Sequence, residues 1–284
     1  MKFSNNNKGL FDQASIECSK ITTKLYSTSF SLGILCLDKS IRDGIYAIYG
    51  YVRFADEIVD TFHGYDQKEL LDRFEEETYD AISKRISLNP ILNSFQYTVN
   101  RYDINLELID KFLSSMRTDL TKSIHDDDSF AEYILGSAEV VGLMCLHVFC
   151  DGDNQQYESL RPNAMKLGAA FQKINFLRDA NADLNGLGRI YFPNVDFSNF
   201  NEEIKNRILQ EIALDFKDGY EGIKKLPIKA RFGVYLAYIY YVALFKKIKN
   251  TPSRMLLTER IRVKNSSKML LLVSSFFKYR LNLI

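Results

Sequence analysis

Four aspartates occur as two pairs with the same spacing, Asp56 with Asp60 and Asp179 with Asp183. Residues four apart lie on one face of an α-helix, so each pair would present two carboxylates one turn apart. Oxygen ligands without a nearby Cys or His favour a hard cation, Mg²⁺ or alternatively Mn²⁺, over zinc. Mg²⁺ typically takes one or two carboxylates plus phosphate oxygens. The two pairs together therefore suggest a diphosphate held through bridging metal ions.

The first pair belongs to an apolar segment, residues 46–60. On a helical wheel one narrow arc collects Tyr46, Tyr49, Arg53 and the two aspartates, and nearly all other positions are apolar or aromatic. A helix that is apolar nearly all round is usually buried, and buried carboxylates need a compensating cation. Arg53 supplies only part of that charge. Two interpretations remain open here: a solvated acidic stripe closed by an ion pair, or a divalent-metal site that faces a cavity.

The second pair lies in a similar arrangement. Gln172, Asn175, Asp179 and Asp183 fall within a helical arc of about 80°, with Arg178 beside them. Two such helices that face each other would place four carboxylates around one cleft. The repetition favours the metal site over the solvated stripe.

The composition indicates which elements must position these groups. The chain has 284 residues, of which 46% are hydrophobic, and it contains only 14 Gly and 5 Pro but 17 Tyr and 20 Phe. Few turn residues between long stretches of helical periodicity predict an all-α protein with one domain, residues 1–284, in which residues 1–10 form a flexible lead-in. The aromatic residues suit a large apolar pocket, although most would simply fill the core. A net charge of +1 gives no reason to expect nucleic acid as a partner.

The cysteines and the termini suggest where the protein works. The four cysteines form no CxxC pair and no secretory signal precedes them, so reduced thiols in a cytoplasmic protein are expected. The sequence contains no continuous run of about 18 apolar residues, so no membrane span is expected. The C-terminal strip MLLLVSSFFKYR, with Lys278 and Arg280, either contacts the inner face of a membrane or closes the bundle. The oligomeric state is not indicated.

Helical periodicity and its breaks divide the chain into ten expected helices and two long loops. The helices are expected at residues 11–26, 38–61, 67–87, 90–102, 106–120, 130–150, 157–183, 202–220, 227–249 and 252–283, and the loops at 121–129 and 184–199.

Several single positions allow two interpretations. The hydroxyl cluster 27–31 either caps a helix or offers donors to a phosphate. Gly142, within a nearly all-apolar helix, permits close approach by a neighbouring helix or by a substrate tail. His147 is expected to be a core residue, and the acidic loop around His125 a solvated turn. Arg189 follows the second pair closely enough to reach a phosphate, although a surface position is the usual outcome.

These segments resemble one known family over about residues 18–272: the squalene/phytoene synthases, which are head-to-head prenyl transferases. The segments that carry the resemblance are YSTSF (26–30), YAIYGYVRFADEIVD (46–60), YILGSAEVVGLM (133–144), FQKINFLRDANADLNGLGRIYFP (171–193), Tyr241 and ERIRV (259–263). Among subgroups the chain is most similar to bacterial phytoene synthases.

The resemblance implies an isoprenoid-synthase-like helical bundle around a central apolar cavity, and it implies a role for each matching residue. Asp56, Asp60, Asp179 and Asp183 would hold Mg²⁺; Arg53, Arg178 and Arg260 would contact diphosphate, helped by Ser27, Ser29 and Tyr241; Gln172 and Asn175 would line the cleft; Tyr133 and Tyr49 would face the reacting carbons; and Val141 and Gly142 would border the prenyl tails.

The implied reaction is the Mg²⁺-dependent condensation of two geranylgeranyl diphosphates to phytoene, through a cyclopropyl diphosphate, in carotenoid biosynthesis. NADPH is not expected for that reaction. One alternative is the synthesis of squalene or dehydrosqualene from farnesyl diphosphate. An alternative of another class is a non-catalytic helical protein that keeps the fold for binding or assembly.

Three positions depart from the family's pattern. Glu57 stands where many members have Asp, and Ala182 replaces an acidic residue that commonly precedes the last aspartate. Tyr26 occupies a position where some relatives have a His. The departures put in doubt a third metal ligand at position 182 and a phosphate contact at position 26.

Overall fold

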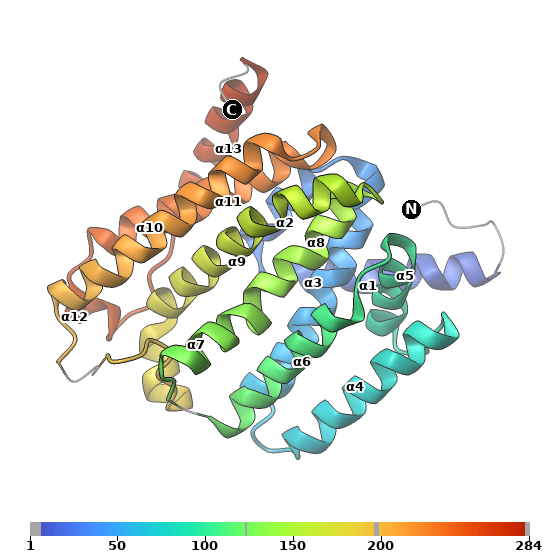
Figure 1. Ribbon diagram of the computed structural model, residues 1–284, viewed down its shortest axis with the longest axis horizontal. Helices are drawn as coiled ribbons and strands as arrows, with labels where there is room; N and C mark the ends of the chain where they lie inside the picture. The colour runs from blue at the N-terminus through green and yellow to red at the C-terminus, as the bar shows by residue number, and fades with distance from the viewer. Residues whose placement is uncertain (1–6, 123, 196–198, 282–284) are drawn as a thin grey trace.

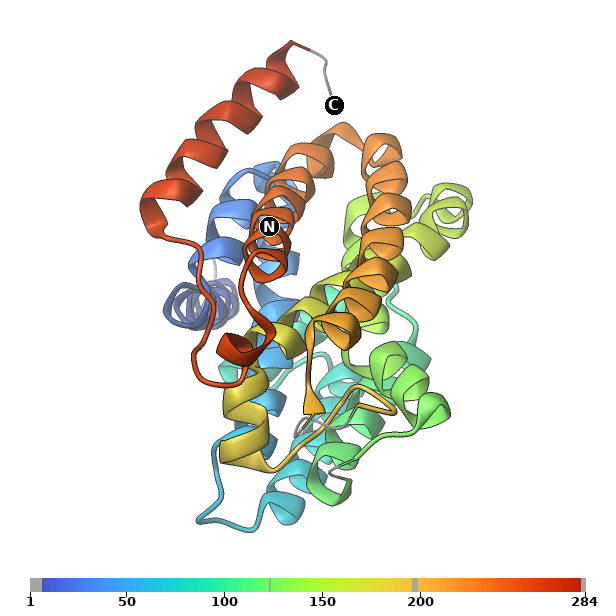
Figure 2. The same cartoon turned by 90° about the vertical axis from the view of Figure 1, so that its left-hand side faces the viewer.

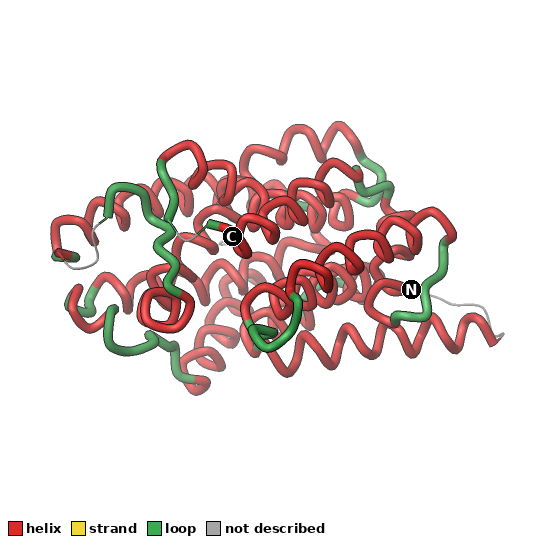
Figure 3. Tube along the Cα trace, turned by 90° about the horizontal axis from the view of Figure 1, so that it is seen from below, coloured by secondary structure: helices red, strands yellow, loops and turns green. Residues whose placement is uncertain are grey.

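Helices make up nearly all of the described chain, which comprises residues 7–122, 124–195 and 199–281 of the computed structural model (Figure 1). The helices are α1 (Asn7–Tyr26), α2 (Thr28–Leu35), α3 (Lys39–Asp60), α4 (Gln67–Lys84), α5 (Pro90–Tyr102), α6 (Leu106–Thr121), α7 (Asp127–Ile134), η1 (Leu135–Glu139), α8 (Val140–Cys150), α9 (Asn154–Ala182), η2 (Asp183–Leu187), α10 (Glu202–Lys225), α11 (Ile228–Lys249), α12 (Ser253–Leu256) and α13 (Asn265–Arg280). Within the described residues, the only strand-like pairing is an isolated bridge between Ile124 and Ile190, and Figure 3 accordingly shows helices and loops.

Helix α3 carries the first aspartate pair and is fixed at both ends. Its N-cap is Asp38, whose carboxylate accepts a hydrogen bond from the Ser40 amide at 2.9 Å. Near the C-terminus, the Gln67 side chain donates to the carbonyls of Ile58 and Val59, at 2.7 and 3.1 Å. These carbonyls belong to the last turn, which has no intrahelical partners of its own. The ends of α3 are therefore satisfied without using Asp60.

Two helical stretches contain a turn of π-helix. The stretch predicted at 130–150 begins at Asp127 and passes through η1, and the second aspartate pair spans the junction of α9 and η2. A π-turn takes in an extra residue and changes which residues face inward after it. Helical periodicity at 3.6 residues per turn did not reveal either turn. The loop predicted from 184 accordingly starts later, after Gly188, whose φ of 65° ends η2.

The core consists of two apolar clusters, one centred on α3 to α6 with α8 and the other on α9 to α11. In the first cluster the ring of Tyr51 stacks on Phe95, with ring centroids 3.7 Å apart. The helices cross closely where small residues permit it: a Cβ on Gly233 of α11 would lie 2.6 Å from the Gly33 carbonyl oxygen of α2. Figure 2 shows α9 running between the two halves of the bundle.

Some of the predicted boundaries are wrong. Helix α1 begins at Asn7, within the predicted lead-in, of which residues 1–6 lie outside the described residues. The single helix predicted at 252–283 is broken into α12 and α13 by an irregular segment, residues 257–264. Helix α2 (Thr28–Leu35) was not predicted, whereas the remaining helices were, and α5 has the predicted bounds.

Two helical stretches have the length and mean hydropathy of a membrane span, Asp127–Cys150 and Ile228–Lys249. In the most apolar 18 residues of each stretch, 56% and 39% are buried within the described bundle, where both pack against other helices. The core helix of a bundle has the same composition, so their apolar character alone does not place them in a membrane.

Candidate active site

A single cavity of about 930 Å³ brings together all the residues that the sequence nominated. They are Ser27, Ser29, Tyr49, Arg53, Asp56, Asp60, Tyr133, Val141, Gly142, Gln172, Asn175, Arg178, Asp179, Asp183, Tyr241 and Arg260. Charged and amide side chains line one end of the cavity, and apolar side chains such as Leu37, Leu146, Phe149 and Leu226 line the rest. Their roles in binding and catalysis remain predictions.

The two aspartate pairs face each other across this cavity. Burial, and then the neighbouring Asp60, raise the pKa of Asp56 to about 7. Burial also raises the pKa of Asp183 to about 7, with further contributions from Asp179 on its own helix and from Asp60 on α3. The contribution of Asp60 to Asp183 means that carboxylates of the two pairs lie close together although they are more than 120 residues apart in sequence.

Guanidinium groups stand beside each pair. Arg53 forms an ion pair with Glu57 and lies 3.9 Å from Asp56, and the ring of Tyr26 lies 4.4 Å from its guanidinium carbon. Within the described residues, the buried Nε of Arg53 has no hydrogen-bond partner, which leaves one donor for an anion. On the opposite side, Asp179 lies between Arg178 and Arg260, with Nε–O distances of 3.0 and 2.7 Å.

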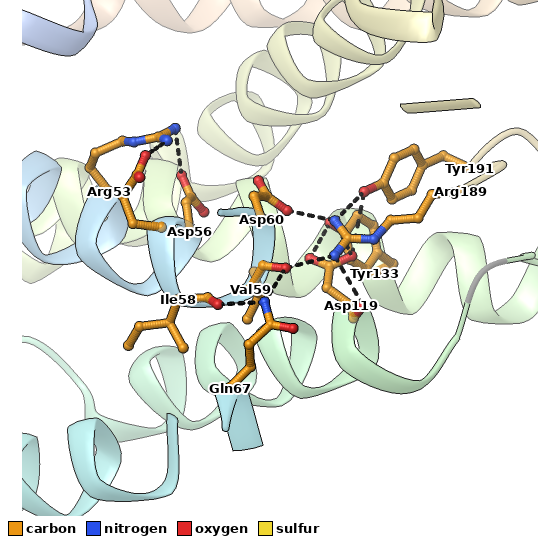
Figure 4. A network of polar contacts seen from close by, with 11 residues as sticks. Arg53, Asp56, Ile58, Val59, Asp60, Gln67, Asp119, Tyr133, Arg189 and Tyr191 are labelled. Atoms are coloured by element: carbon orange, nitrogen blue, oxygen red, sulfur yellow. Dashed lines mark hydrogen bonds and ion pairs between the residues drawn. The ribbon is translucent and has the colours of Figure 1, made fainter. Parts of the chain in front are cut away.

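Sequence reasoning missed the buried centre of the site, which Figure 4 shows. Arg189 is buried, with 8% of its side chain exposed, and its Nη1 lies 2.6 Å from Asp60 and 3.7 Å from Asp119. Its Nη2 donates to the carbonyls of Val59 and Asp119, both at 3.1 Å. Although burial alone would lower the pKa of Arg189, Asp119 and Asp60 raise it. The expected surface position of Arg189 is therefore wrong, because two carboxylates and two carbonyls hold its charge inside the protein.

Asp119 also accepts hydrogen bonds from two tyrosines. The hydroxyl of Tyr133 donates to it at 2.8 Å and that of Tyr191 at 3.4 Å. Burial, and then Asp119, raise the pKa of Tyr133 well above its ordinary value, so the phenol stays neutral. A signal for Asp119 was present in the sequence: it continues the buried face of α6 at helical spacing from Phe112 and Met116.

The sequence predicted a solvated turn around His125, but His125 lies against this buried centre. Its side chain is buried, and its ring centroid is 5.0 Å from that of Tyr133 and 5.7 Å from that of Tyr191. Its amide donates to the Ile190 carbonyl, which ties His125 to the segment after η2. His125 therefore supports the rings of Tyr133 and Tyr191, which line the cavity.

The opposite wall is built from α2, α9 and α11. The hydroxyl of Tyr241 donates to Asn175 at 3.1 Å, and the Asn175 amide donates to Gln172 at 3.3 Å. The hydroxyl oxygen of Ser27 accepts from the Phe30 amide at 3.2 Å, which confirms the capping interpretation.

Two further cations line the polar end and were not singled out in advance. Arg262 and Lys268 follow Arg260 and reach the same cavity. Burial lowers the pKa of Lys268, and the charges of Arg178 and Arg262 add to the shift. Such a concentration of positive charge fits a polyanion better than a neutral ligand.

The apolar end lies between α8, α9, α10 and α11. A Cβ on Gly142 would lie 3.1 Å from the Ala164 carbonyl oxygen of α9, which confirms the close helix contact. Gly142 also lines the cavity, and its contact with a substrate tail stays a prediction. The predicted core position of His147 is only partly right, because its ring packs on Tyr157 at 4.1 Å between centroids while its Nε2 has no partner within the described residues.

The donor set fits a hard divalent cation that is shared with a ligand. In the ranges that the structure describes, no three His, Cys, Asp or Glu side chains converge closely enough to hold an ion by themselves. Burial and neighbouring carboxylates nevertheless raise the pKa values of Asp56 and Asp183, a cost that a divalent cation would offset. Diphosphate oxygens would complete the coordination, as is usual for Mg²⁺.

Known proteins share this fold and sequence pattern. A sequence model of the family described as squalene/phytoene synthase matches residues 23–267. Phytoene synthase 1 from the chloroplast of Solanum lycopersicum is 26% identical over 291 residues, covering 96% of this chain and 70% of its own. The phytoene synthase of Arthrospira platensis is 26% identical over 258 residues, or 82% of each chain. The crystal structure of a dehydrosqualene synthase in complex with a ligand has a TM-score of 0.80 at 19% identity, over 95% of this chain and 98% of the other. The predicted all-α fold is thus confirmed.

Proposed function

The chain belongs to the squalene/phytoene synthase family of prenyltransferase-type enzymes, and we propose that it condenses two geranylgeranyl diphosphates head to head to form phytoene. The observation that carries the proposal is one cavity that joins four aspartates and several arginines at one end to an apolar interior. A prenyl diphosphate has the same division into a charged head and an apolar tail. The similarity to two phytoene synthases supports the choice of that product.

The residues at the polar end would bind and activate the diphosphate. Arg53, Arg178 and Arg260 would donate to its oxygens, and the hydroxyls of Ser27 and Ser29 would add donors. Asp56 and Asp60, with Asp179 and Asp183, would hold Mg²⁺, which supplies a positive charge that stabilises the diphosphate as it leaves.

The aromatic and apolar walls would protect the allylic cation that remains. Tyr49, Phe30, Phe171 and Tyr241 place ring faces beside the polar end, where they exclude water and attract a cation. The cation then adds to the alkene of the second prenyl diphosphate, and loss of a proton closes the ring of a cyclopropyl diphosphate. That species ionises again, rearranges and loses a proton.

Tyr133 or the released diphosphate would take the last proton. The phenol oxygen of Tyr133 can accept a proton while its own proton passes to Asp119, to which it is already hydrogen-bonded at 2.8 Å. The pKa of Asp119, raised by burial to about 7, makes its carboxylate an adequate acceptor near neutral pH. NADPH would not take part, because the condensation to phytoene needs no reduction.

One other product has an observation in its favour. A dehydrosqualene synthase has the same fold over nearly the whole chain, so squalene or dehydrosqualene from farnesyl diphosphate is the second candidate. The protein would work in the cytoplasm, with access to a membrane for its apolar product.

The test is to incubate the purified protein and Mg²⁺ with farnesyl or geranylgeranyl diphosphate, with and without NADPH. Mass and ultraviolet spectrum identify the product. We expect a forty-carbon triene, formed from geranylgeranyl diphosphate whether or not NADPH is present. A thirty-carbon product alone would support the second candidate, and no release of diphosphate from either substrate would support a non-catalytic binding or assembly protein.

A further inference from the structure

Helix α13 presents an apolar face that no described part of the chain covers. Its outer face consists of Met269, Leu270, Val273 and Phe277, whose exposed fractions range from 47% to 71%, and Phe276, 47% exposed, lies at its edge, where its ring is 6.1 Å from that of Phe232 of α11 between centroids. At 100° per residue these five side chains occupy one arc of about 120°. The inner face packs on α11, where Ser275 is buried and Tyr279 contacts Phe232. An exposed apolar surface of this kind marks an interaction site.

The charge around this face is of one sign. After Glu259 the chain contains no Asp or Glu, and six of its last 25 residues are basic: Arg260, Arg262, Lys264, Lys268, Lys278 and Arg280. The whole chain has a net charge of only +1, so this concentration is local. It disfavours a second copy of the chain as the occupant, because two such segments would repel each other. An apolar helix face edged by Lys and Arg is typical of helices that lie on anionic lipid.

The outer face lies beside the candidate active site. Lys268 in the first turn of α13 and Val263 just before it line the cavity, as do Leu25 and Tyr26 at the end of α1. Leu25 is 78% exposed and Tyr26 50% exposed, so a second apolar segment borders the same part of the cavity. Figure 2 shows α13 and α1 on the same side of the molecule, with α13 extending beyond the rest of the bundle.

We propose that the outer face of α13, together with Leu25 and Tyr26 of α1, docks the protein on an anionic membrane with the cavity next to the bilayer. Lipid is the chemistry that suits both the apolar arc and the cations. The purpose of docking on this side rests on the proposed function. The hydrocarbon product does not dissolve in water and can pass from the cavity into the bilayer. Docking itself involves no substrate.

Flotation with lipid vesicles tests the surface directly. The full chain is mixed, without substrate or metal, with vesicles of phosphatidylcholine alone or with about one third phosphatidylglycerol. We expect binding to the anionic vesicles, weaker binding to the neutral ones, and a loss of binding as salt is raised. The double variant Leu270→Ser/Phe277→Ser should bind at least about tenfold more weakly, since it removes two large apolar side chains from the contact. The variant Lys278→Glu/Arg280→Glu should lose the preference for anionic vesicles.

Matched changes on α10 provide controls. Leu214 is 63% exposed there, and Arg207 and Lys217 are exposed cations on the same helix. Figure 2 shows α10 on the side of the bundle opposite α13. The variants Leu214→Ser and Arg207→Glu/Lys217→Glu should bind vesicles as the unchanged protein does. Melting curves of all variants should coincide, because every substituted side chain is exposed.

Three results would overturn the proposal. The first is absence of flotation with anionic vesicles. The second is equal binding by the α13 and α10 variants, which would make the contact non-specific. The third is a dimer in sedimentation equilibrium that Leu270→Ser/Phe277→Ser dissociates, which would assign the face to a second copy. Since none of these measurements involves turnover, a failure of docking is separate from a failure of the proposed reaction. With detergent-dispersed substrate, the α13 variants should keep the activity of the unchanged protein.

Discussion

Replacing Arg189 with Met should destabilise the protein far more than the same replacement of a surface arginine that also pairs with two carboxylates. Arg189 is the only cation that directly pairs with Asp119 among the described ion pairs, and only 3% of the Asp119 side chain is exposed. Met keeps much of the length and apolar stem of Arg but removes the charge. Asp119 would then be left buried with two tyrosine hydroxyls and no positive partner.

The magnitude follows from this burial. Removing one partner of a buried ion pair typically costs about 3–5 kcal/mol, because the other charge stays desolvated. Asp60 adds little to that figure, since more than a third of its side chain is exposed to solvent. We therefore expect the free energy of unfolding to fall by about 3–5 kcal/mol, a large part of the roughly 5–15 kcal/mol that holds a typical domain folded.

Urea unfolding followed by circular dichroism measures this change. Arg117→Met is the matched control, because Arg117 also pairs with two carboxylates, Asp72 and Glu75, but at the surface; it should cost no more than about 1 kcal/mol. The double variant Arg189→Met/Asp119→Asn should recover at least about 2 kcal/mol, since it removes the stranded charge. Equal losses for Arg189→Met and Arg117→Met, or no recovery in the double variant, would refute this reasoning.

Three further outcomes are expected. Asp60→Ala or Asp183→Ala should lower turnover by at least about 10²-fold while circular dichroism shows an intact fold, because both carboxylates face the cavity; near-normal activity in either would count against the assignment. Treatment with EDTA should abolish release of diphosphate and added Mg²⁺ or Mn²⁺ should restore it, whereas full activity in the chelator would exclude a metal role. Ala164→Phe, which adds bulk to the apolar end beside Gly142, should raise the preference in kcat/KM for farnesyl over geranylgeranyl diphosphate by about tenfold; an unchanged ratio would mean that the tails do not reach this region.

The features of the fold and of the site that follow from local sequence patterns could be predicted. Helical periodicity located the helices other than α2, and the bounds of α5 were predicted without error, its start because Pro90 is a strong signal for the first helical position. Asp-x-x-x-Asp spacing, read with the family resemblance, identified residues that the fold gathers around one cavity.

Features that depend on tertiary contacts could not be predicted in the same way. The Arg189–Asp119 pair joins residues 70 positions apart, and no local pattern distinguishes Arg189 from a surface arginine. The π-turns of η1 and η2 and the break before α13 are also invisible to a fixed period of 3.6 residues. This gap in the prediction matters most at the site itself, where the second aspartate pair spans the junction of α9 and the π-turn η2.

The most direct test of this account is a crystal structure with Mn²⁺ and an unreactive prenyl thiodiphosphate, in which anomalous scattering locates the metal. We predict Mn²⁺ between Asp56/Asp60 of α3 and Asp179/Asp183 of α9–η2, bridged to the diphosphate, with the prenyl tail in the apolar end of the cavity. Mn²⁺ bound elsewhere, or a diphosphate held away from these four aspartates, would contradict it.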